Sequence, residues 1–292
     1  MIYVICGPTG SGKTKASLEL ASFFHAPIIN ADAFQIYQNM DIGTAKIAKN
    51  HPLYEKHYLL DIVTPENTFS VKQYQDIFRK TIDELRNEYN DIVVVGGTGL
   101  YIKASLFDFD FENNSNEEND DLDTKTNEEL WDILKELDCK SLDSLHKNNR
   151  KRVIRAIRIA KYHTFNKSDN IEMQSHEMIY KDVRIMFINP PREELYNQIN
   201  LRVEEMFSKG LVEEVKGLLK KYQLSLTASQ AIGYKEIISY FKNDITLEEA
   251  KELIKKRTRN YAKRQVTYFK HQFQAEEFLS TQDLIMAAKR YE

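Results

Sequence analysis

The chain has 292 residues, 42% of them hydrophobic and 29% charged, which is ordinary for a folded protein and predicts one to two domains. Its net charge of −3 excludes a uniformly basic nucleic-acid-binding protein but leaves room for local basic patches. No apolar run is long enough for a transmembrane helix, and a glycine-rich motif at Gly7 leaves no room for a signal peptide. Cys6 and Cys139 match no zinc or disulfide pattern, so we expect a cytoplasmic protein.

The first hundred residues alternate between short apolar runs and amphipathic segments. The pattern predicts strands at 1–6, 27–31, 57–62 and 91–95 and helices at 15–24 and 71–89. Ser70 and Gln73 form a capping box at the start of the second helix, and Phe69 and Tyr74 are spaced as its hydrophobic staple. Strands that alternate with helices are typical of a parallel sheet, so we expect an α/β fold.

An acidic segment interrupts this pattern. Residues 108–123 hold eight acidic side chains and no basic one, which is typical of a mobile loop or hinge. Residues 126 to about 161 are helical by pattern, and their end is basic. We therefore expect a core made of residues 1–111 and 166–292, with a small helical insertion at 112–165.

The last third of the chain predicts one more strand and then mostly helices. A buried strand is expected at 183–188, and helices are expected at 192–209, 211–222 and 246–272. Gly210 ends the first of these helices, and a capping box of Thr246 and Glu249 starts the last one.

A phosphate-binding pattern, G-x-x-x-x-G-K-[ST], is matched by Gly7, Pro8, Thr9, Gly10, Ser11, Gly12, Lys13 and Thr14. The motif lies between a predicted strand and a predicted helix, which is its expected context and makes a structural glycine turn the weaker alternative. The loop turns backbone N–H groups towards phosphate oxygens, and the helix N-terminus adds a positive dipole end. Lys13 supplies a charge for the outer phosphates, and the Thr14 hydroxyl supplies a ligand for Mg²⁺. The fold is therefore predicted to be a P-loop NTPase-like parallel sheet flanked by helices.

The loop alone does not say what the phosphate belongs to. P-loop NTPases carry an acidic residue at the end of a second strand, which positions Mg²⁺. The predicted strand 91–95 ends instead in Gly96-Gly97-Thr98-Gly99, and Asp32 is the strand-end carboxylate nearest to the loop in sequence. A site that holds diphosphate without setting up hydrolysis favours group transfer over a motor or a switch.

Several segments of the chain resemble the tRNA dimethylallyltransferase family. They follow the family's order along nearly the whole chain, at residues 7–14, 32–37, 41–46, 96–101, 152–158, 202–211, 228–236 and 257–265. The resemblance implies that the phosphate loop holds dimethylallyl diphosphate rather than ATP. It also implies transfer of the prenyl group to the N6 amine of the adenosine just 3′ of the anticodon, with the helical insertion as a tRNA clamp. Ala33 departs from the family, which usually has Ser there.

The resemblance also assigns roles to single residues. Arg202 matches a second diphosphate clamp, for which an arginine fork is suited because it binds two oxygens; a surface ion pair is the alternative. Asp32 matches the general base that takes a proton from the adenine amine, although by itself it is equally consistent with a Mg²⁺ ligand or a turn cap. Thr98 matches a hydroxyl near the reacting centre, with a helix N-cap as the alternative. The expected catalytic residues are Asp32, Thr98 and Lys13.

A target base in a stem-loop must be flipped out of its stack, which requires a grip on the RNA. Residues 147–161 hold seven Lys or Arg and no acid, and residues 251–270 hold eight against Glu252. A solvated helix face is the alternative for each run. Gln35 can hydrogen-bond an adenine edge. The residues expected to bind tRNA are Asp32, Ala33, Phe34, Gln35, Arg152, Arg155, Arg257, Arg259 and Lys263, with Phe34, Tyr37 and Tyr261 as candidates for stacking on bases.

Three other functions stay open at this point. A small-molecule kinase would bind ATP tightly and would not need the basic runs. An adenylate isopentenyltransferase would keep Asp32 and Lys13 without a grip on RNA. A nucleic-acid-binding ATPase should carry a strand-end acid for hydrolysis, which we do not find. The leading hypothesis is a monomeric enzyme whose partners are the anticodon stem-loop of tRNA, dimethylallyl diphosphate and Mg²⁺, with no membrane.

Overall fold

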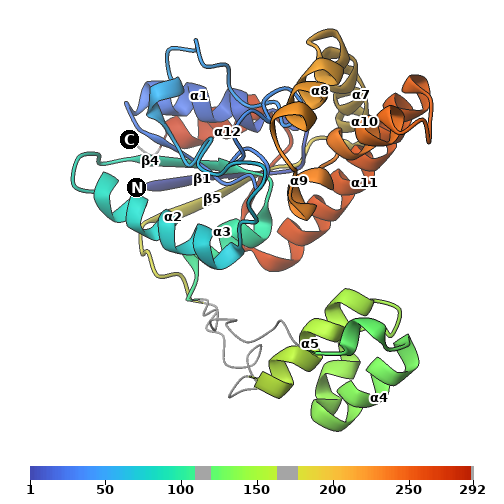
Figure 1. The fold of residues 1–292 in the computed structure, drawn as a ribbon. Coiled ribbons are helices and arrows are strands. Elements are labelled where there is room, and N and C mark those ends of the chain that lie inside the picture. The colour runs from blue at the N-terminus through green and yellow to red at the C-terminus, as the bar shows by residue number, and fades with distance from the viewer. Residues whose placement is uncertain (109–119, 163–176, 291–292) are drawn as a thin grey trace. The chain divides into compact units, whose positions relative to one another are not determined.

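The computed structural model describes residues 1–108, 120–162 and 177–290 (Figure 1). The chain forms two compact units, one of Met1–Leu106 with Tyr180–Glu292 and the other of Phe107–Ile179. The boundaries expected at 112 and 165, and most of the acidic segment, lie outside the described residues. Among the residues described, no helix combines the length and the apolar character needed to cross a membrane.

A parallel sheet forms the centre of the first unit. Within the described residues it has six strands in the order β3-β2-β4-β1-β5-β6, and every neighbouring pair is parallel. The strands are β1 (Ile2–Cys6), β2 (Ile28–Asn30), β3 (His57–Tyr58), β4 (Ile92–Gly96), β5 (Val183–Ile188) and β6 (Glu276–Phe278). The inner strands are runs of buried Ile and Val, as expected where helices cover both faces of a sheet. The predicted parallel α/β fold is confirmed.

The register of this sheet brings three chain segments to one edge. Cys6 of β1 is opposite Gly96 of β4, and Asn30 of β2 is opposite Val95 of the same strand. The carboxyl ends of β1, β4 and β2 therefore lie side by side, which is where ligands bind in open α/β sheets. The phosphate loop, Thr98 and Asp32 follow directly after these strand ends.

Two layers of helices cover the sheet, as Figure 1 shows. Helices α1 (Lys13–Phe23) and α12 (Thr281–Lys289) pack together on one face, through Ala16 and Leu20 against Leu284 and Ile285. Helices α2 (Val71–Leu85) and α3 (Gly99–Leu106) pack together on the other face.

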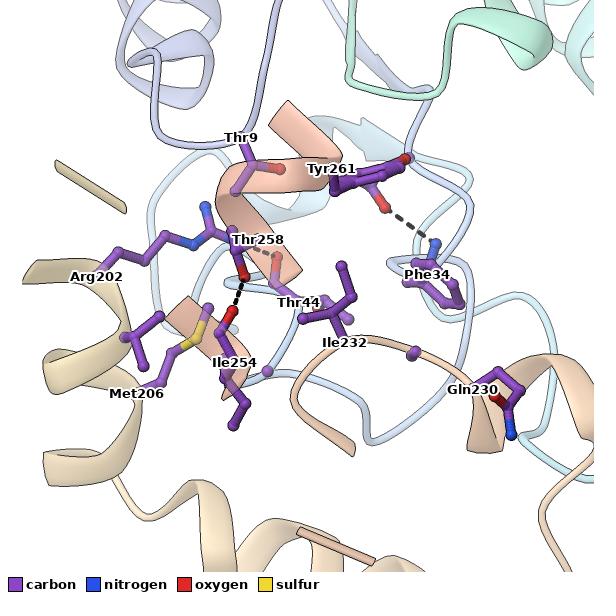
Figure 2. A pocket seen from close by; sticks show the side chains of 14 residues that line it. Thr9, Phe34, Thr44, Arg202, Met206, Gln230, Ile232, Ile254, Thr258 and Tyr261 are labelled. Atoms are coloured by element: carbon purple, nitrogen blue, oxygen red, sulfur yellow. Dashed lines mark hydrogen bonds between the residues drawn. The ribbon is translucent and has the colours of Figure 1, made fainter. Parts of the chain in front are cut away.

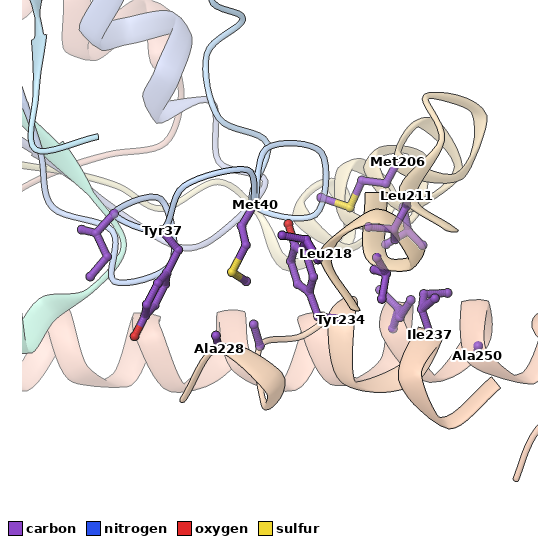
Figure 3. Close-up of a cluster of buried hydrophobic side chains, with 14 of the residues drawn as sticks. Tyr37, Met40, Met206, Leu211, Leu218, Ala228, Tyr234, Ile237 and Ala250 are labelled. Carbon is purple, nitrogen blue, oxygen red and sulfur yellow. The ribbon is translucent and has the colours of Figure 1, made fainter. Parts of the chain in front are cut away.

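A group of helices extends the first unit beyond the carboxyl edge of the sheet. It consists of α7 (Arg192–Ser208), α8 (Leu211–Lys221), α9 (Leu226–Ser229), α10 (Tyr234–Phe241) and α11 (Leu247–Gln272). Their buried side chains form one cluster with Tyr37 and Met40, which belong to the long connection after β2 (Figure 3). This packing ties the connection to the helices and so places it beside the phosphate loop.

The second unit contains α4 (Asn127–Leu137) and α5 (Arg150–Tyr162), with short 3₁₀ turns at Leu122–Thr124 and Cys139–Asp143. Its core is a small cluster that includes Leu122, Leu130, Leu134, Val153 and Ile157. Arg158 forms a bidentate pair with Asp120, at 2.9 Å for both bonds, and so ties α5 to the start of the unit.

Most predicted elements agree with the structure, and two of the differences have local causes. The capping boxes at Ser70 and Thr246 are confirmed. The strand predicted at 57–62 was too long, because Leu59 and Asp61 adopt a left-handed backbone (φ 63° and 53°) that ends the pairing. The helix predicted over 126–161 is two helices, because the chain leaves helical geometry at Asp138 (φ −152°).

Candidate active site

The phosphate loop connects β1 to α1, which begins at Lys13. The Lys13 ammonium donates to the Pro8 carbonyl at 2.7 Å, so its charge is held over the loop. Burial lowers the pKa of Lys13 to about 8; the Asp32 carboxylate opposes this shift and the Arg202 guanidinium adds to it. Lys13 is therefore a poorly hydrated cation near other charges, a setting that favours an anionic ligand.

A small polar pocket of about 50 Å³ lies against this loop. Its wall includes Thr9, Lys13, Thr14, Asp32, Gln35 and Arg202, so the predicted clamp is brought to the loop from α7. Arg202 Nη2 donates to the Thr44 carbonyl at 3.2 Å, and its buried Nε has no partner among the described residues. Burial lowers the pKa of Arg202 as well. Two cations with unsatisfied hydrogen-bonding capacity make this pocket suited to a diphosphate.

A larger pocket of about 260 Å³ adjoins the polar one (Figure 2). The two pockets share Thr9, Asp32, Thr44 and Arg202. The rest of the larger wall is mainly apolar and is contributed by Phe34, Val203, Met206, Ala231, Ile232, Ile254 and Tyr261. A ligand with a charged end and an apolar end could therefore occupy both pockets at once.

Asp32 stands where the two pockets meet, and its neighbours fix its orientation. Its Oδ1 accepts from the Phe34 N–H at 3.0 Å, in a turn that follows β2. Asn30 stabilises the same turn, because its side chain accepts from the Asp32 N–H and donates to the carbonyls of Asp32 and Leu59. Burial, and then the Asp32 charge, raise the pKa of Tyr261 to about 12, so the phenol stays protonated beside the carboxylate.

Thr98 occupies the turn between β4 and α3. Its hydroxyl accepts from the Ala33 N–H at 3.0 Å, and its carbonyl accepts from the Ile102 N–H at 3.2 Å in the first turn of α3. Other residues form the two pocket walls, so Thr98 reaches the site through the Ala33 backbone. Its catalytic role stays a prediction.

Sequence reasoning missed Gln265. Its Oε1 accepts from the Thr9 N–H at 2.9 Å and its Nε2 donates to the Gly97 carbonyl at 2.8 Å, so one buried amide joins the phosphate loop to the end of β4. A Cβ at position 97 would lie 2.4 Å from Nε2, which explains the glycine there. A signal existed: Thr258, Tyr261 and Gln265 are polar residues spaced along one face of a predicted helix.

The residues expected to contact the target base are only partly brought together. Asp32 and Phe34 line the larger pocket. Gln35 lines the polar pocket instead, and its Nε2 donates to the Thr44 carbonyl at 3.1 Å. The prediction that Tyr37 stacks on a base was wrong, because its side chain is wholly buried in the cluster that joins the connection after β2 to the helices. Tyr261 does line the larger pocket.

Of the basic residues predicted to bind tRNA on α11 and α5, some are exposed and others have partners within the protein. On α11, Arg257 is ion-paired with the buried carboxylate of Glu236, and Arg259 donates to the Asn200 side chain at 2.6 Å. Lys263 is exposed on the same helix. On α5, Arg152 and Arg155 are exposed. Arg257 therefore has a structural partner, and the tRNA-binding roles of all five residues stay predictions.

The family model described as IPP transferase matches residues 35–272. The chain belongs to the IPP transferase family. The match begins after the phosphate loop and Asp32, so the placement of those residues in the site rests on the geometry given above.

Other members of the IPP transferase family are similar over nearly all of the chain. It is 42% identical over 278 residues to the tRNA dimethylallyltransferase of Bacillus anthracis, covering 92% of this chain and 88% of the relative. Among solved structures, the tRNA delta(2)-isopentenylpyrophosphate transferase of Staphylococcus epidermidis has a TM-score of 0.71 and 35% identity, covering 99% and 97% of the two chains. The full-length tRNA isopentenylpyrophosphate transferase of Bacillus halodurans has a TM-score of 0.71 and 33% identity, covering 99% and 94%.

The residues of the polar pocket fit the expected magnesium ion. Mg²⁺ takes oxygen ligands, keeps several waters and is commonly shared with substrate phosphates. Thr14 is exposed at this pocket and offers a hydroxyl, and Asp32 offers a carboxylate in the same wall. No group of three or more His, Cys, Asp or Glu in the described part of the chain could hold a metal by itself. A magnesium ion here would therefore depend on oxygens of the diphosphate.

Proposed function

We propose that this protein transfers the dimethylallyl group of dimethylallyl diphosphate to the N6 amine of the adenosine 3′-adjacent to the anticodon in tRNA, releasing diphosphate. One observation carries the proposal. In this member of the IPP transferase family, the polar pocket at the phosphate loop adjoins a mainly apolar pocket, and Asp32 and Arg202 line both. The comparisons give no support to a kinase or to an adenylate isopentenyltransferase.

The polar pocket stabilises the leaving group. As the bond between the allylic carbon and the diphosphate oxygen breaks, its electron pair leaves with the diphosphate. Lys13, Arg202 and the N–H groups of the loop are placed to hold the negative charge that develops there. Thr14 would help to hold a magnesium ion here, which would supply further positive charge at the leaving group.

The larger pocket holds the dimethylallyl group and the target adenine. Its apolar wall, with Met206 and Ile254, surrounds the dimethylallyl group and keeps water from the electron-poor carbon. Phe34 and Tyr261 offer aromatic faces for the flipped adenine. The amine nitrogen forms the new bond to the allylic carbon, and its proton passes to Asp32 at the junction of the pockets.

The RNA grip belongs to the same proposal. Exposed basic residues on α11 and α5 neutralise phosphates of the anticodon stem-loop, and the second unit acts as a clamp. The enzyme acts as a monomer in the cytoplasm.

A transfer assay with two donors and two acceptors tests this function. The protein is incubated with labelled dimethylallyl diphosphate or labelled ATP, each with unmodified anticodon stem-loop RNA or with AMP. We expect label only in the RNA and only from dimethylallyl diphosphate. Label in AMP would support the adenylate enzyme, and label from ATP would support a kinase; either result without prenyl transfer to RNA contradicts the proposal. A stem-loop with guanosine in place of the target adenosine is the matched control.

A further inference from the structure

One carboxylate binds the backbone of the loop at residues 41–46, which lies beside the site and carries the motif Asp-Ile-Gly-Thr-Ala-Lys. Glu214, in the first turn of α8, accepts from the backbone N–H groups of Asp41, Ile42 and Gly43 at 3.0, 2.7 and 3.1 Å. It also accepts from the Tyr234 hydroxyl at 2.7 Å. Four donors to one ionised group make a strong and directional anchor, because hydrogen bonds to a charged acceptor are stronger than neutral ones.

Thr44 follows Gly43 in the chain and is part of the active site. The Thr44 carbonyl accepts from Arg202 Nη2 at 3.2 Å and from Gln35 Nε2 at 3.1 Å. Thr44 also lines both pockets, as Figure 2 shows for the larger one. The place of this carbonyl therefore sets where the Arg202 guanidinium lies against the diphosphate pocket.

The packing leaves the loop little freedom to shift. A Cβ at Gly43 would lie 2.5 Å from the Tyr234 ring, and that ring is wholly buried in the cluster of Figure 3. The Lys46 ammonium, almost completely buried, donates to Asp41 at 2.8 Å and to Asp61 at 2.6 Å. Burial, and then the Glu214 charge, raise the pKa of Tyr234 well above its usual value, so its hydroxyl stays a donor.

We propose that Glu214 is a positioning residue for the transfer reaction: it fixes the Thr44 carbonyl, and through it the Arg202 side chain that binds the diphosphate. This inference rests on the proposed function, because it assigns Arg202 to the diphosphate. It also gives a role to two of the segments that resemble the family, at 41–46 and 228–236, which lie outside the catalytic residues. α8 and α10 thus act on the chemistry without touching the substrate.

A double-mutant cycle tests the proposal. Glu214→Gln keeps the size of the side chain but turns an NH₂ group towards backbone donors, so the loop should shift. We expect the Kd for labelled dimethylallyl diphosphate to rise about tenfold in the otherwise unchanged protein and less than about twofold in an Arg202→Ala background. Glu213→Gln removes the same charge from the same helix turn at an exposed position and should leave the Kd unchanged. Equal effects of Glu214→Gln in both backgrounds would mean that Glu214 does not act through Arg202.

Tyr234→Phe provides a second and milder test, should Glu214→Gln lower the melting temperature by enough to prevent folding. It removes one of the four bonds to Glu214 without leaving a cavity, so we expect a rise in Kd of about threefold that disappears in the Arg202→Ala background. The same rise in both backgrounds would overturn the inference. If the unchanged protein neither binds dimethylallyl diphosphate nor transfers it to RNA, the proposed function fails. Binding and transfer with an additive cycle would refute only the role of Glu214.

Discussion

The two pockets of the site are built in different ways. The predicted phosphate-binding groups of the polar pocket come mainly from one continuous segment, residues 7–14, with Arg202 added from α7. The larger pocket collects single side chains from segments that are far apart in the chain, at positions 32, 34, 44, 203, 206, 232, 254 and 261. The first is a local motif on a strand and a helix, whereas the second exists only after the helical group has packed against the sheet.

This difference has a functional consequence. The phosphate loop has local hydrogen bonds, from the Ser11 N–H and the Lys13 ammonium to the Pro8 carbonyl, and one long-range bridge from Thr9 to Gln265. The larger pocket depends more on long-range packing, including the hydrogen bonds by which Glu214 holds the segment before Thr44. Substitutions in the two pockets should therefore affect different steps, and the following experiments are arranged from the largest expected effect to the smallest.

Asp32→Asn should separate chemistry from binding at the junction of the pockets. The amide keeps an acceptor for the Phe34 N–H but cannot take the proton, so single-turnover transfer with both substrates saturating should slow by about 10²–10⁴-fold. The Kd values for tRNA and dimethylallyl diphosphate should change much less. A rate within about threefold of the unchanged protein would exclude Asp32 as the base, since general-base removal costs far more. A large rise in the diphosphate Kd with little loss of rate would instead indicate a magnesium ligand.

Lys13→Ala should damage the polar pocket alone. Removing a charge that faces the leaving group should slow transfer by about 10²–10³-fold and weaken binding of dimethylallyl diphosphate. Binding of tRNA, measured by fluorescence anisotropy, should be nearly unchanged, because the RNA grip lies on other helices. Near-normal transfer by this variant would refute the role of the loop. Lys15→Ala, at an exposed position in the same helix turn, is the matched control.

The pH dependence of diphosphate binding should report on Lys13. Since burial lowers its pKa to about 8, the side chain loses its proton as the pH rises through 8, and an anion binds the protonated form. The Kd for inorganic diphosphate should therefore rise by up to about tenfold per pH unit above pH 8. Lys13→Arg cannot lose its charge in this range and should remove the dependence, whatever its affinity. The same slope in both proteins would assign the titration to another group.

Met206→Ala should mainly affect the larger pocket. It shortens the apolar wall and should raise the Kd for dimethylallyl diphosphate by about tenfold, the usual cost of a lost apolar contact in a binding site. Binding of inorganic diphosphate, which has no apolar end, should stay the same. Leu201→Ala changes a neighbouring, exposed position of α7 and serves as the control. Equal losses for both ligands would mean that the wall does not face the prenyl group.

The smallest effect is expected outside both pockets, on the salt dependence of tRNA binding. Lys263 and Arg264 are exposed on α11, and replacing both with Gln should reduce the slope of log K against log salt by about 1.5. Arg257 is a poor choice for this test, because its removal would leave the buried Glu236 carboxylate without its ion pair. Lys251→Gln with Lys255→Gln, at positions already paired with Glu204, should leave the slope almost unchanged. An unchanged slope in the Lys263 and Arg264 variant would place the RNA elsewhere.

Sequence patterns predicted the elements whose signals are local. The strand at 183–188 and the capping boxes at Ser70 and Thr246 agree with the structure, because each depends on neighbouring residues. The strand β6 and helix α12 were missed. β6 has an exposed and acidic sequence, Glu276-Glu277-Phe278, and pairs only because β5 offers it an edge. Tyr37 was misjudged for a similar reason, since an aromatic residue beside a motif can face the core as easily as the ligand.

The sequence by itself determined the phosphate loop, the alternation of strands and helices, and the strand-end position of Asp32. Each of these follows from spacing within a few residues, where backbone geometry leaves few choices. Only the tertiary structure decided that Arg202 meets the loop, that Gln265 joins it to β4, and that Glu214 holds the loop leading to Thr44. Those contacts join residues more than 150 positions apart, and their formation depends on how α7, α8 and α11 pack against the sheet rather than on any local preference.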